Sequence, residues 1–375
     1  MEVKGICEKR FLKVKEVFEK LHNEGREVGS SFAIYQDGKP LVSLYAGFSD
    51  KDKKIFWAED SLSTVWSTTK GVTAICVALA VEEGLLDYEE KVTTYWPEFG
   101  NNGKENITVG MLLSHQAGIC GGQTKNITDY YSQEIMASKL ANMVPLWEPG
   151  TECGYHSLTY GWLASELMIR TTGMNIGSYF RKKIGDPHDI DFYIGLPESE
   201  EHRVATMYPF KEEKRSKDTI SKLSKALQAI AFAPNVGKAQ KTKEWRKAEI
   251  SSANGQGHAS GLAKLYSLLV PKDESIGILK RSTVQRMTKE QIISRDLVLG
   301  VVMRWGAGFV TNLHKIIYGP VKQSFGHSGF GGSCAFADPE NRIAMSYVMN
   351  KLEPNLAGDS RSVALINTSY ECMDI

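Results

Sequence analysis

The chain has 375 residues, of which 42% are hydrophobic and 24% are charged, and its formal net charge is +1. This composition excludes a disordered or fibrous protein, and the balanced charge gives no reason to expect nucleic acid or an anionic membrane as partner. We therefore expect a small neutral molecule as the ligand. No segment reaches the roughly 20 apolar residues of a membrane span and the N-terminus lacks a signal-peptide pattern, so we expect a cytoplasmic protein. The six widely spaced cysteines favour reduced thiols over disulfides or a zinc site.

The N-terminal part of the chain predicts a helix followed by a β-hairpin. Apolar residues recur at helical spacing between residues 8 and 24, with Lys and Glu between them. Two β-rich runs then occupy residues 30–50, and Asp37-Gly38, a pair typical of tight hairpin turns, separates them.

Helix and loop patterns dominate the middle of the chain, and strand patterns return towards its C-terminus. The middle begins with an apolar, Ala-rich segment at residues 70–84, which predicts a helix closed by Gly84. The expected C-terminal elements are a helix at 260–270, strands within 298–310, 323–339 and 342–350, and a final helix at 360–373.

These elements predict a single domain of the α/β (α+β) class over residues 1–375. An antiparallel sheet flanked by terminal helices is expected from residues 1–66 and 256–375, with a mostly helical lobe, residues 67–255, inserted between them. The helical lobe contains a basic segment, residues 211–247, with 11 Lys and Arg against 4 Asp and Glu. This basic segment is either a solvated insertion or a docking patch for an acidic partner.

The inserted lobe begins with the sequence STTKG, in which Ser67 lies three residues before Lys70. Residues three apart share one face of a helix, so these two side chains could meet at the helix start. A lysine made neutral by burial could take the proton of the serine, and the helix N-terminus would favour a developing oxyanion. The alternative is that Ser67 simply caps the helix and that Lys70 lies on the surface.

Two further segments carry chemistry that suits the Ser67-Lys70 pair. Tyr155 and Ser157 stand in the segment GYHSLTYG, and a tyrosine beside a lysine can relay a proton. The segment GHSGFGG, residues 326–332, is rich in small residues that let a strand edge approach a ligand closely. Its backbone N–H groups could supply half of an oxyanion hole.

In order, spacing and flanking sequence, the three segments resemble the penicillin-recognising serine hydrolases. The likeness is greatest to the branch that holds class C β-lactamases, D,D-peptidases and family VIII esterases, together with eukaryotic β-lactamase domain-containing proteins. It extends over almost the whole chain, from about residue 10 to residue 370. The resemblance implies a β-lactamase/transpeptidase-like fold and a serine hydrolase that opens ester or amide bonds through an acyl-enzyme, with no metal or other cofactor.

The resemblance also implies a role for each matching residue. Ser67 would be the acylated nucleophile, Lys70 its base or charge partner, and Tyr155 the proton shuttle. The backbone N–H groups of Ser67 and Phe330 would form the oxyanion hole. The other residues expected to contact the substrate are Ser157, His327, Ser328 and Gly329.

Two departures from the family pattern favour an esterase or peptidase over an antibiotic-degrading enzyme. Ser157 stands where β-lactamases of this branch usually carry asparagine, and it cannot offer an amide to the substrate. His327 stands where they usually carry lysine, and a histidine that is mostly neutral near pH 7 is a poorer anchor for a β-lactam carboxylate.

Other functional classes fit the sequence less well. A G-x-S-x-G nucleophile elbow is excluded because Phe330 stands where the second glycine is required, and the eight histidines lack the spacing of a metal site. His115 and His258 are expected to be structural. The remaining alternative is a β-lactamase-like scaffold that is weakly active or inactive and self-assembles, so the formation of a homo-oligomer is left open.

Overall fold

The structure is a computed structural model, and it describes residues 1–375 except 51, 53, 122–123, 211–224 and 232–235. Two parts of the predicted basic segment 211–247, namely 211–224 and 232–235, therefore lie outside the described residues. Its described parts include three short helices: α9 (Lys225–Ala231), α10 (Val236–Ala239) and α11 (Lys243–Lys247). The choice between a solvated insertion and a docking patch stays a prediction.

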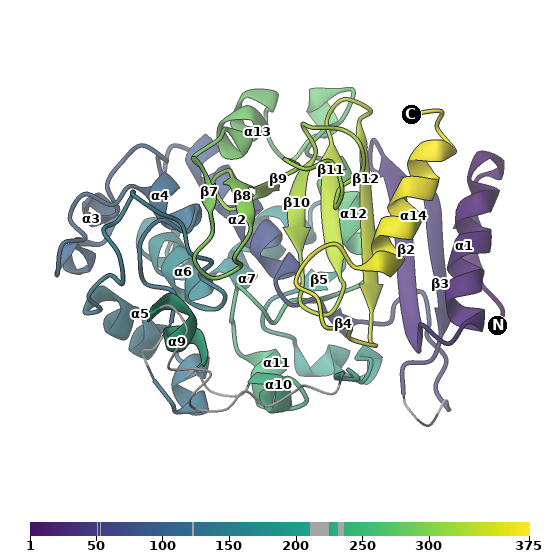
Figure 1. Ribbon diagram of the computed structural model, residues 1–375, viewed down its shortest axis with the longest axis horizontal. Coiled ribbons are helices and arrows are strands. Elements are labelled where there is room, and N and C mark those ends of the chain that lie inside the picture. Colours follow the sequence, from purple (N-terminus) through teal and green to yellow (C-terminus); the bar gives the residue numbers. More distant parts are fainter. Residues whose placement is uncertain (51, 53, 122–123, 211–224, 232–235) are drawn as a thin grey trace.

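Within the described residues, nine strands form one antiparallel sheet that is built from both ends of the chain (Figure 1). In spatial order the strands are β1 (Lys4–Cys7), β3 (Lys39–Gly47), β2 (Gly29–Gln36), β12 (Ile343–Met349), β11 (Cys334–Asp338), β10 (Phe325–Ser328), β9 (Val310–Thr311), β8 (Val302–Trp305) and β7 (Ile292–Arg295). The central pair, β2 and β12, joins the N-terminal strands to the C-terminal ones. The predicted sheet architecture is thereby confirmed.

The predicted hairpin consists of β2 and β3. Its turn residues Asp37 and Gly38 have φ angles of 51° and 73°, the left-handed conformations that a type I′ turn requires. Strand β1 was not predicted, because most of its four residues are exposed and it lacks the apolar alternation of a half-buried strand. It adds to the free edge of β3 instead.

Helices cover both faces of this sheet (Figure 1). On one face α1 (Leu12–Asn23) packs against α14 (Ser360–Glu371), and on the other α12 (Ala259–Ser267) contacts β2, β11 and β12. Every residue of β12 is buried, which is why its sequence reads as an almost continuous apolar run. The helices predicted at both chain ends are therefore confirmed.

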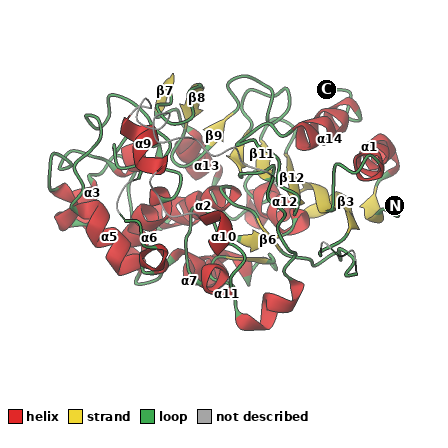
Figure 2. Ribbon diagram, turned by 60° about the horizontal axis from the view of Figure 1, so that its bottom comes forward, coloured by secondary structure: helices red, strands yellow, loops and turns green. Residues whose placement is uncertain are grey.

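The second lobe is mostly helical and lies to one side of the large sheet (Figure 2). Its helices are α3 (Val92–Tyr95), α4 (Val109–Leu113), α5 (Gln133–Ala141), α6 (Thr159–Thr172) and α7 (Ile176–Phe180). Helix α2 (Thr68–Glu82) contacts β10 and β11 on one side and α6 and α7 on the other. Because α2 lies between the two lobes it is buried almost all round, and its sequence is correspondingly apolar.

Short elements complete the fold. A small sheet has the strand order β4 (Ser63–Thr64), β6 (Gln256–Gly257) and β5 (Phe192–Tyr193), so segments just before Ser67 and just before α12 lie side by side. The remaining elements are the helix α13 (Arg281–Thr288), the π-helical segment η4 (Arg181–Gly185) and the short 3₁₀ helices η1 (Lys9–Phe11), η2 (Pro97–Gly100), η3 (Ile127–Tyr131), η5 (Glu198–Arg203) and η6 (Glu274–Ile276).

Two expectations from the sequence are not decided by the fold. Among the helices that the structure describes, none is long and apolar enough to cross a bilayer. The cytoplasmic location and the lobe boundaries at residues 67 and 255 stay predictions.

Candidate active site

Ser67 is the cap residue at the N-terminus of α2, at the seam between the lobes. Its side chain makes no capping hydrogen bond within the described chain, so its hydroxyl is not occupied by the helix. The preceding Trp66 has a φ of 48°, a left-handed conformation that is rare for a bulky residue. The ring of Trp66 contacts those of Trp245 and Phe330, with centroid separations of 6.2 and 5.6 Å, and these contacts hold the turn before Ser67.

Lys70 is completely buried one turn further along α2. Its Nζ lies 3.0 Å from Ser67 Oγ, 2.6 Å from the carbonyl oxygen of Ser157 and 2.9 Å from that of Ser252. Burial lowers the pKa of Lys70 well below its ordinary value. A neutral amine has two N–H donors and one lone pair, so the two carbonyls take both donors and the lone pair is left for the hydroxyl of Ser67. Lys70 is therefore not the surface lysine of the alternative, and Ser67 occupies the cap position without using its hydroxyl to cap the helix.

Tyr155 lies beside both residues of this pair. Lys70 Nζ is 4.8 Å from the centroid of its ring. Burial raises the pKa of Tyr155, although the nearby Ser67 hydroxyl opposes the rise, so the phenol is neutral at pH 7. The ring stacks on Trp305 at a centroid separation of 5.9 Å. Tyr155 is thus a proton donor held within reach of the serine.

The backbone of Tyr155 is held by Asp296, which follows β7. Asp296 Oδ1 accepts hydrogen bonds from the N–H groups of Tyr155 at 3.0 Å, Val298 at 2.9 Å and Leu299 at 2.9 Å. The carboxylate is completely buried, and its Oδ2 has no hydrogen-bond partner in the described chain. Because Leu299 lines the cavity in front of Ser67, Asp296 connects the position of Tyr155 to the cavity wall.

Strand β10 brings His327 and Ser328 to the site. His327 Nδ1 lies 2.9 Å from the carbonyl oxygen of Ser328, so Nδ1 carries the proton and Nε2 is left as an acceptor. Burial is the largest cause that lowers the pKa of His327, to about 3. The imidazole is therefore neutral at pH 7. The Ser328 hydroxyl lies 3.2 Å from that of Tyr318.

Two backbone N–H groups near the start of α2 are left without a hydrogen-bond partner in the described chain. The N–H groups of Ser67 and Phe330 make no hydrogen bond to any described residue. Gly329 packs against the residues before Ser67, since a Cβ at this position would lie 2.2 Å from the carbonyl oxygen of Val65. This close approach, which only glycine allows, places the loop after β10 next to the start of α2.

A cavity of about 420 Å³ opens in front of Ser67. None of the described side chains that line it is charged at pH 7. Its polar lining residues are Ser67, Tyr155, Tyr318, His327, Ser328 and Asn355. Its apolar lining residues include Phe210, Leu299, Val301, Met303, Val310, Ile317, Phe330 and Leu356. Such a lining suits a neutral and partly apolar ligand.

The structure brings most of the predicted site residues to this cavity. Ser67, Tyr155, His327, Ser328 and Phe330 line it, and Lys70 contacts Ser67 from within α2. Two predicted residues do not line it. Ser157 offers its carbonyl oxygen to Lys70, and the N–H of Gly329 donates to the carbonyl of Ser333 at 2.7 Å.

Sequence reasoning missed several residues of the site, because they stand outside the three segments and carry no motif of their own. They are Ser252, Asp296, Trp305, Tyr318 and Asn355.

The two histidines expected to be structural do have backbone partners. His115 Nδ1 accepts the N–H of His156 at 3.2 Å, and His258 Nδ1 accepts that of Gly261 at the start of α12, also at 3.2 Å. No group of three or more His, Cys, Asp or Glu in the described ranges is arranged to hold a metal ion.

Comparisons with known proteins agree with this geometry. The family model described as Beta-lactamase matches residues 14–368. The esterase/beta-lactamase LipL of Mycobacterium tuberculosis is 31% identical over 360 residues, which cover 93% of this chain and 83% of LipL. A solved family VIII carboxylesterase is 40% identical with a TM-score of 0.93, covering 99% of this chain and 100% of that chain. A penicillin-binding protein homologue from Caulobacter crescentus is 38% identical with a TM-score of 0.92, at the same coverage.

Fold and comparisons together define an esterase-like serine hydrolase with the β-lactamase/transpeptidase-like fold. The chain belongs to the β-lactamase family. The resemblance predicted from the three sequence segments is confirmed.

Proposed function

We propose that the protein hydrolyses carboxylic esters through an acyl-enzyme on Ser67. The observation that carries this proposal is the surroundings of Lys70. A buried amine, with two carbonyl oxygens as its other neighbours, lies 3.0 Å from Ser67 Oγ. Burial lowers the pKa of this amine well below its ordinary value and the amine is aimed at the serine, which is what general-base activation of a hydroxyl requires.

Each remaining group then has a step to perform. Lys70 takes the proton of Ser67 as Oγ attacks the ester carbonyl, and the N–H groups of Ser67 and Phe330 receive the oxyanion. Neutral Tyr155 gives its proton to the departing alkoxide and regains one from the Lys70 ammonium. In the second half of the reaction the neutral Lys70 amine takes a proton from a water molecule as its oxygen attacks the acyl-enzyme. Tyr155 then gives its proton to the departing Ser67 Oγ and regains one from the Lys70 ammonium, and the acid is released.

The cavity supports a neutral ester as the substrate. His327 is neutral, and the other described lining residues carry no charge, so a substrate carboxylate would find no cation there. The apolar lining favours short acyl chains with an alkyl or aryl alcohol. We therefore propose esters rather than β-lactams or peptide C-termini, both of which carry a carboxylate.

Intact-protein mass spectrometry with a fluorophosphonate tests this proposal. We expect the wild type to gain one adduct and to release p-nitrophenol from p-nitrophenyl acetate, while Ser67→Ala does neither and keeps the wild-type circular dichroism spectrum. A chromogenic β-lactam at matched concentration should be turned over far more slowly than the ester. A folded wild type with neither adduct nor turnover would refute the proposal, and measurement of its size in solution would then test the self-assembling scaffold.

A further inference from the structure

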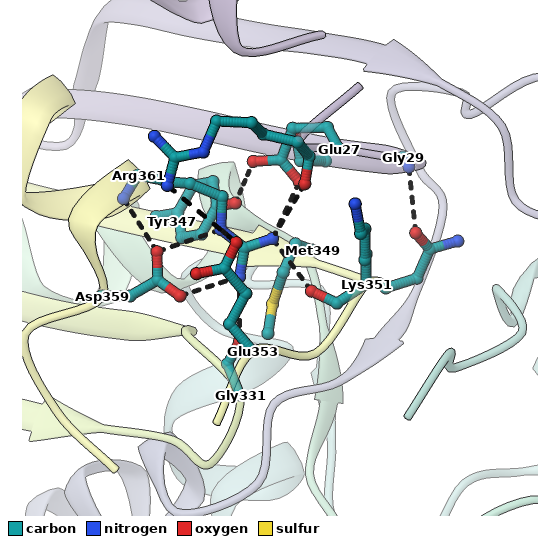
Figure 3. Close-up of polar contacts among 12 residues, drawn as sticks. Glu27, Gly29, Gly331, Tyr347, Met349, Lys351, Glu353, Asp359 and Arg361 are labelled. Carbon is teal, nitrogen blue, oxygen red and sulfur yellow. Dashed lines mark hydrogen bonds and ion pairs between the residues drawn. The ribbon is translucent and has the colours of Figure 1, made fainter. Parts of the chain in front are cut away.

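A buried cluster of charged and polar side chains lies next to the loop that carries Phe330 (Figure 3). Arg361, in the first turn of α14, is completely buried. Its Nε and Nη2 donate to the two carboxylate oxygens of Asp359 at 3.0 and 2.8 Å, and its Nη1 lies 3.3 Å from Glu27 Oε2. The hydroxyl of Tyr347 donates to Glu27 Oε1. We call Arg361, Asp359, Glu27 and Tyr347 the Arg361 cluster.

The cluster is in direct contact with the loop at residues 329–333. Arg361 Nη2 donates to the carbonyl oxygen of Gly331 at 2.9 Å. Gly332 has a φ of 132°, and a Cβ there would lie 2.5 Å from Asp359 Oδ2 and 2.8 Å from Arg361 Nη2. Only glycine therefore lets the loop lie this close to the buried charges.

Two peptide groups connect the guanidinium to the N–H of Phe330. The carbonyl of Gly331, which accepts the bond from Arg361, belongs to the same planar peptide group as the N–H of Gly332. That N–H donates to the carbonyl oxygen of Gly329 at 3.1 Å. The carbonyl of Gly329 in turn shares its peptide group with the N–H of Phe330. A hydrogen-bonded chain of this kind fixes the orientation of each peptide and polarises it.

We propose that Arg361 is a positioning residue for the oxyanion hole: through these two peptide groups its guanidinium orients and polarises the N–H of Phe330. The proposal rests on the function proposed above, in which this N–H receives the oxyanion. Asp359 and Glu27 hold the guanidinium in place. Asn355 extends the network to the cavity wall, because its Nδ2 donates to Asp359 Oδ2 at 3.1 Å.

Arg361→Lys tests this role, since lysine keeps the charge but cannot make the forked contacts of a guanidinium. We expect kcat on p-nitrophenyl acetate to fall about 10-fold while KM changes less than about two-fold, because the loss falls on the transition state. The inhibition constant of phenylboronic acid should rise by the same factor as kcat falls. Its tetrahedral adduct on Ser67 places an oxygen where the oxyanion forms.

The matched control is Arg203→Lys. Arg203 is another largely buried arginine, and it pairs with Asp191 and Glu200. We expect this control to lower the melting temperature by a similar amount and to leave kcat and boronate inhibition unchanged.

The possible results separate the two proposals. A lower melting temperature with unchanged kcat and unchanged boronate inhibition in Arg361→Lys would overturn the positioning role. If Arg361→Lys does not fold, Gly332→Ala is measured in its place, since its Cβ would press on the same cluster, and an unchanged kcat there overturns the role equally. A wild type that neither reacts with a fluorophosphonate at Ser67 nor binds the boronate would instead refute the proposed function.

Discussion

Lys70 and Arg361 are both completely buried, yet their surroundings give them opposite properties. Lys70 has carbonyl oxygens and a serine hydroxyl as neighbours, and burial lowers its pKa. Burial also acts to lower the pKa of Arg361, but the charges and hydrogen bonds around it, from Glu27 and Asp359 among others, raise that pKa overall. The difference teaches that burial produces a base only where the fold provides no counter-charge. The surroundings of Lys70 favour a neutral amine, whereas those of Arg361 keep its guanidinium charged.

The largest expected effect comes from giving the Lys70 site a permanent charge. The guanidinium of Lys70→Arg stays protonated and cannot accept the proton of Ser67, so kcat should fall at least about 10³-fold. Ester hydrolysis measures the loss, with circular dichroism to confirm the fold. Lys70→Met, which has neither a charge nor a base, is the control and should lose as much. Activity retained in Lys70→Arg would mean that another group is the base.

The second effect concerns the stability of the Arg361 cluster. Burial raises the pKa of Glu27 from 4.5 to about 7, so the folded state binds this proton more tightly than the unfolded state. The stability that the proton contributes is fully present below pH 4.5 and is lost as the pH rises through 7. Relative to Glu27→Gln, the free energy of unfolding of the wild type should fall by on the order of 3 kcal/mol over that range. Urea titrations at pH 5 and pH 8 measure it, and parallel pH profiles of the two proteins would contradict it.

The third effect tests the neutral phenol beside Lys70. Tyr155→Phe keeps the ring that stacks on Trp305 but removes the proton donor, so kcat should fall about 10²-fold. The melting temperature should stay close to that of the wild type. A rate near that of the wild type would assign the proton relay to another group, with His327 as the first to examine.

The smallest effect is expected at Asp296. Asp296→Asn keeps an acceptor for the three backbone N–H groups but replaces charge-assisted bonds by neutral ones of roughly half the strength. We expect kcat to fall about five-fold, as Tyr155 is held less firmly. Asp189→Asn alters a fully exposed carboxylate and serves as the control. Equal rates in both variants would limit Asp296 to a structural role.

Local sequence patterns were sufficient for the larger elements of the fold. Asp37-Gly38 and the flanking β-rich runs predicted the hairpin, and the apolar segment after Ser67 predicted α2. Strands β1, β4, β5, β6 and β7 were missed. They are two to four residues long, too short for a local period to mark them, and the partners of the first four lie far along the chain.

The residues of the candidate site likewise fall into those that the local sequence predicted and those that only the tertiary structure brought together. By itself the sequence determined that Ser67 and Lys70 share the start of one helix, because helical spacing is a local property, and the family resemblance added Tyr155 and the loop at residues 326–332. Only the tertiary structure decided the lowered pKa of Lys70, whose acceptor Ser252 is 182 residues away. It also decided the anchor of Tyr155, since Asp296 is 141 residues from it. The contact of Arg361 with the carbonyl oxygen of Gly331 likewise spans 30 residues. Burial and hydrogen-bond partners set the pKa and the orientation of a group, and both depend on which distant segments the fold packs against it.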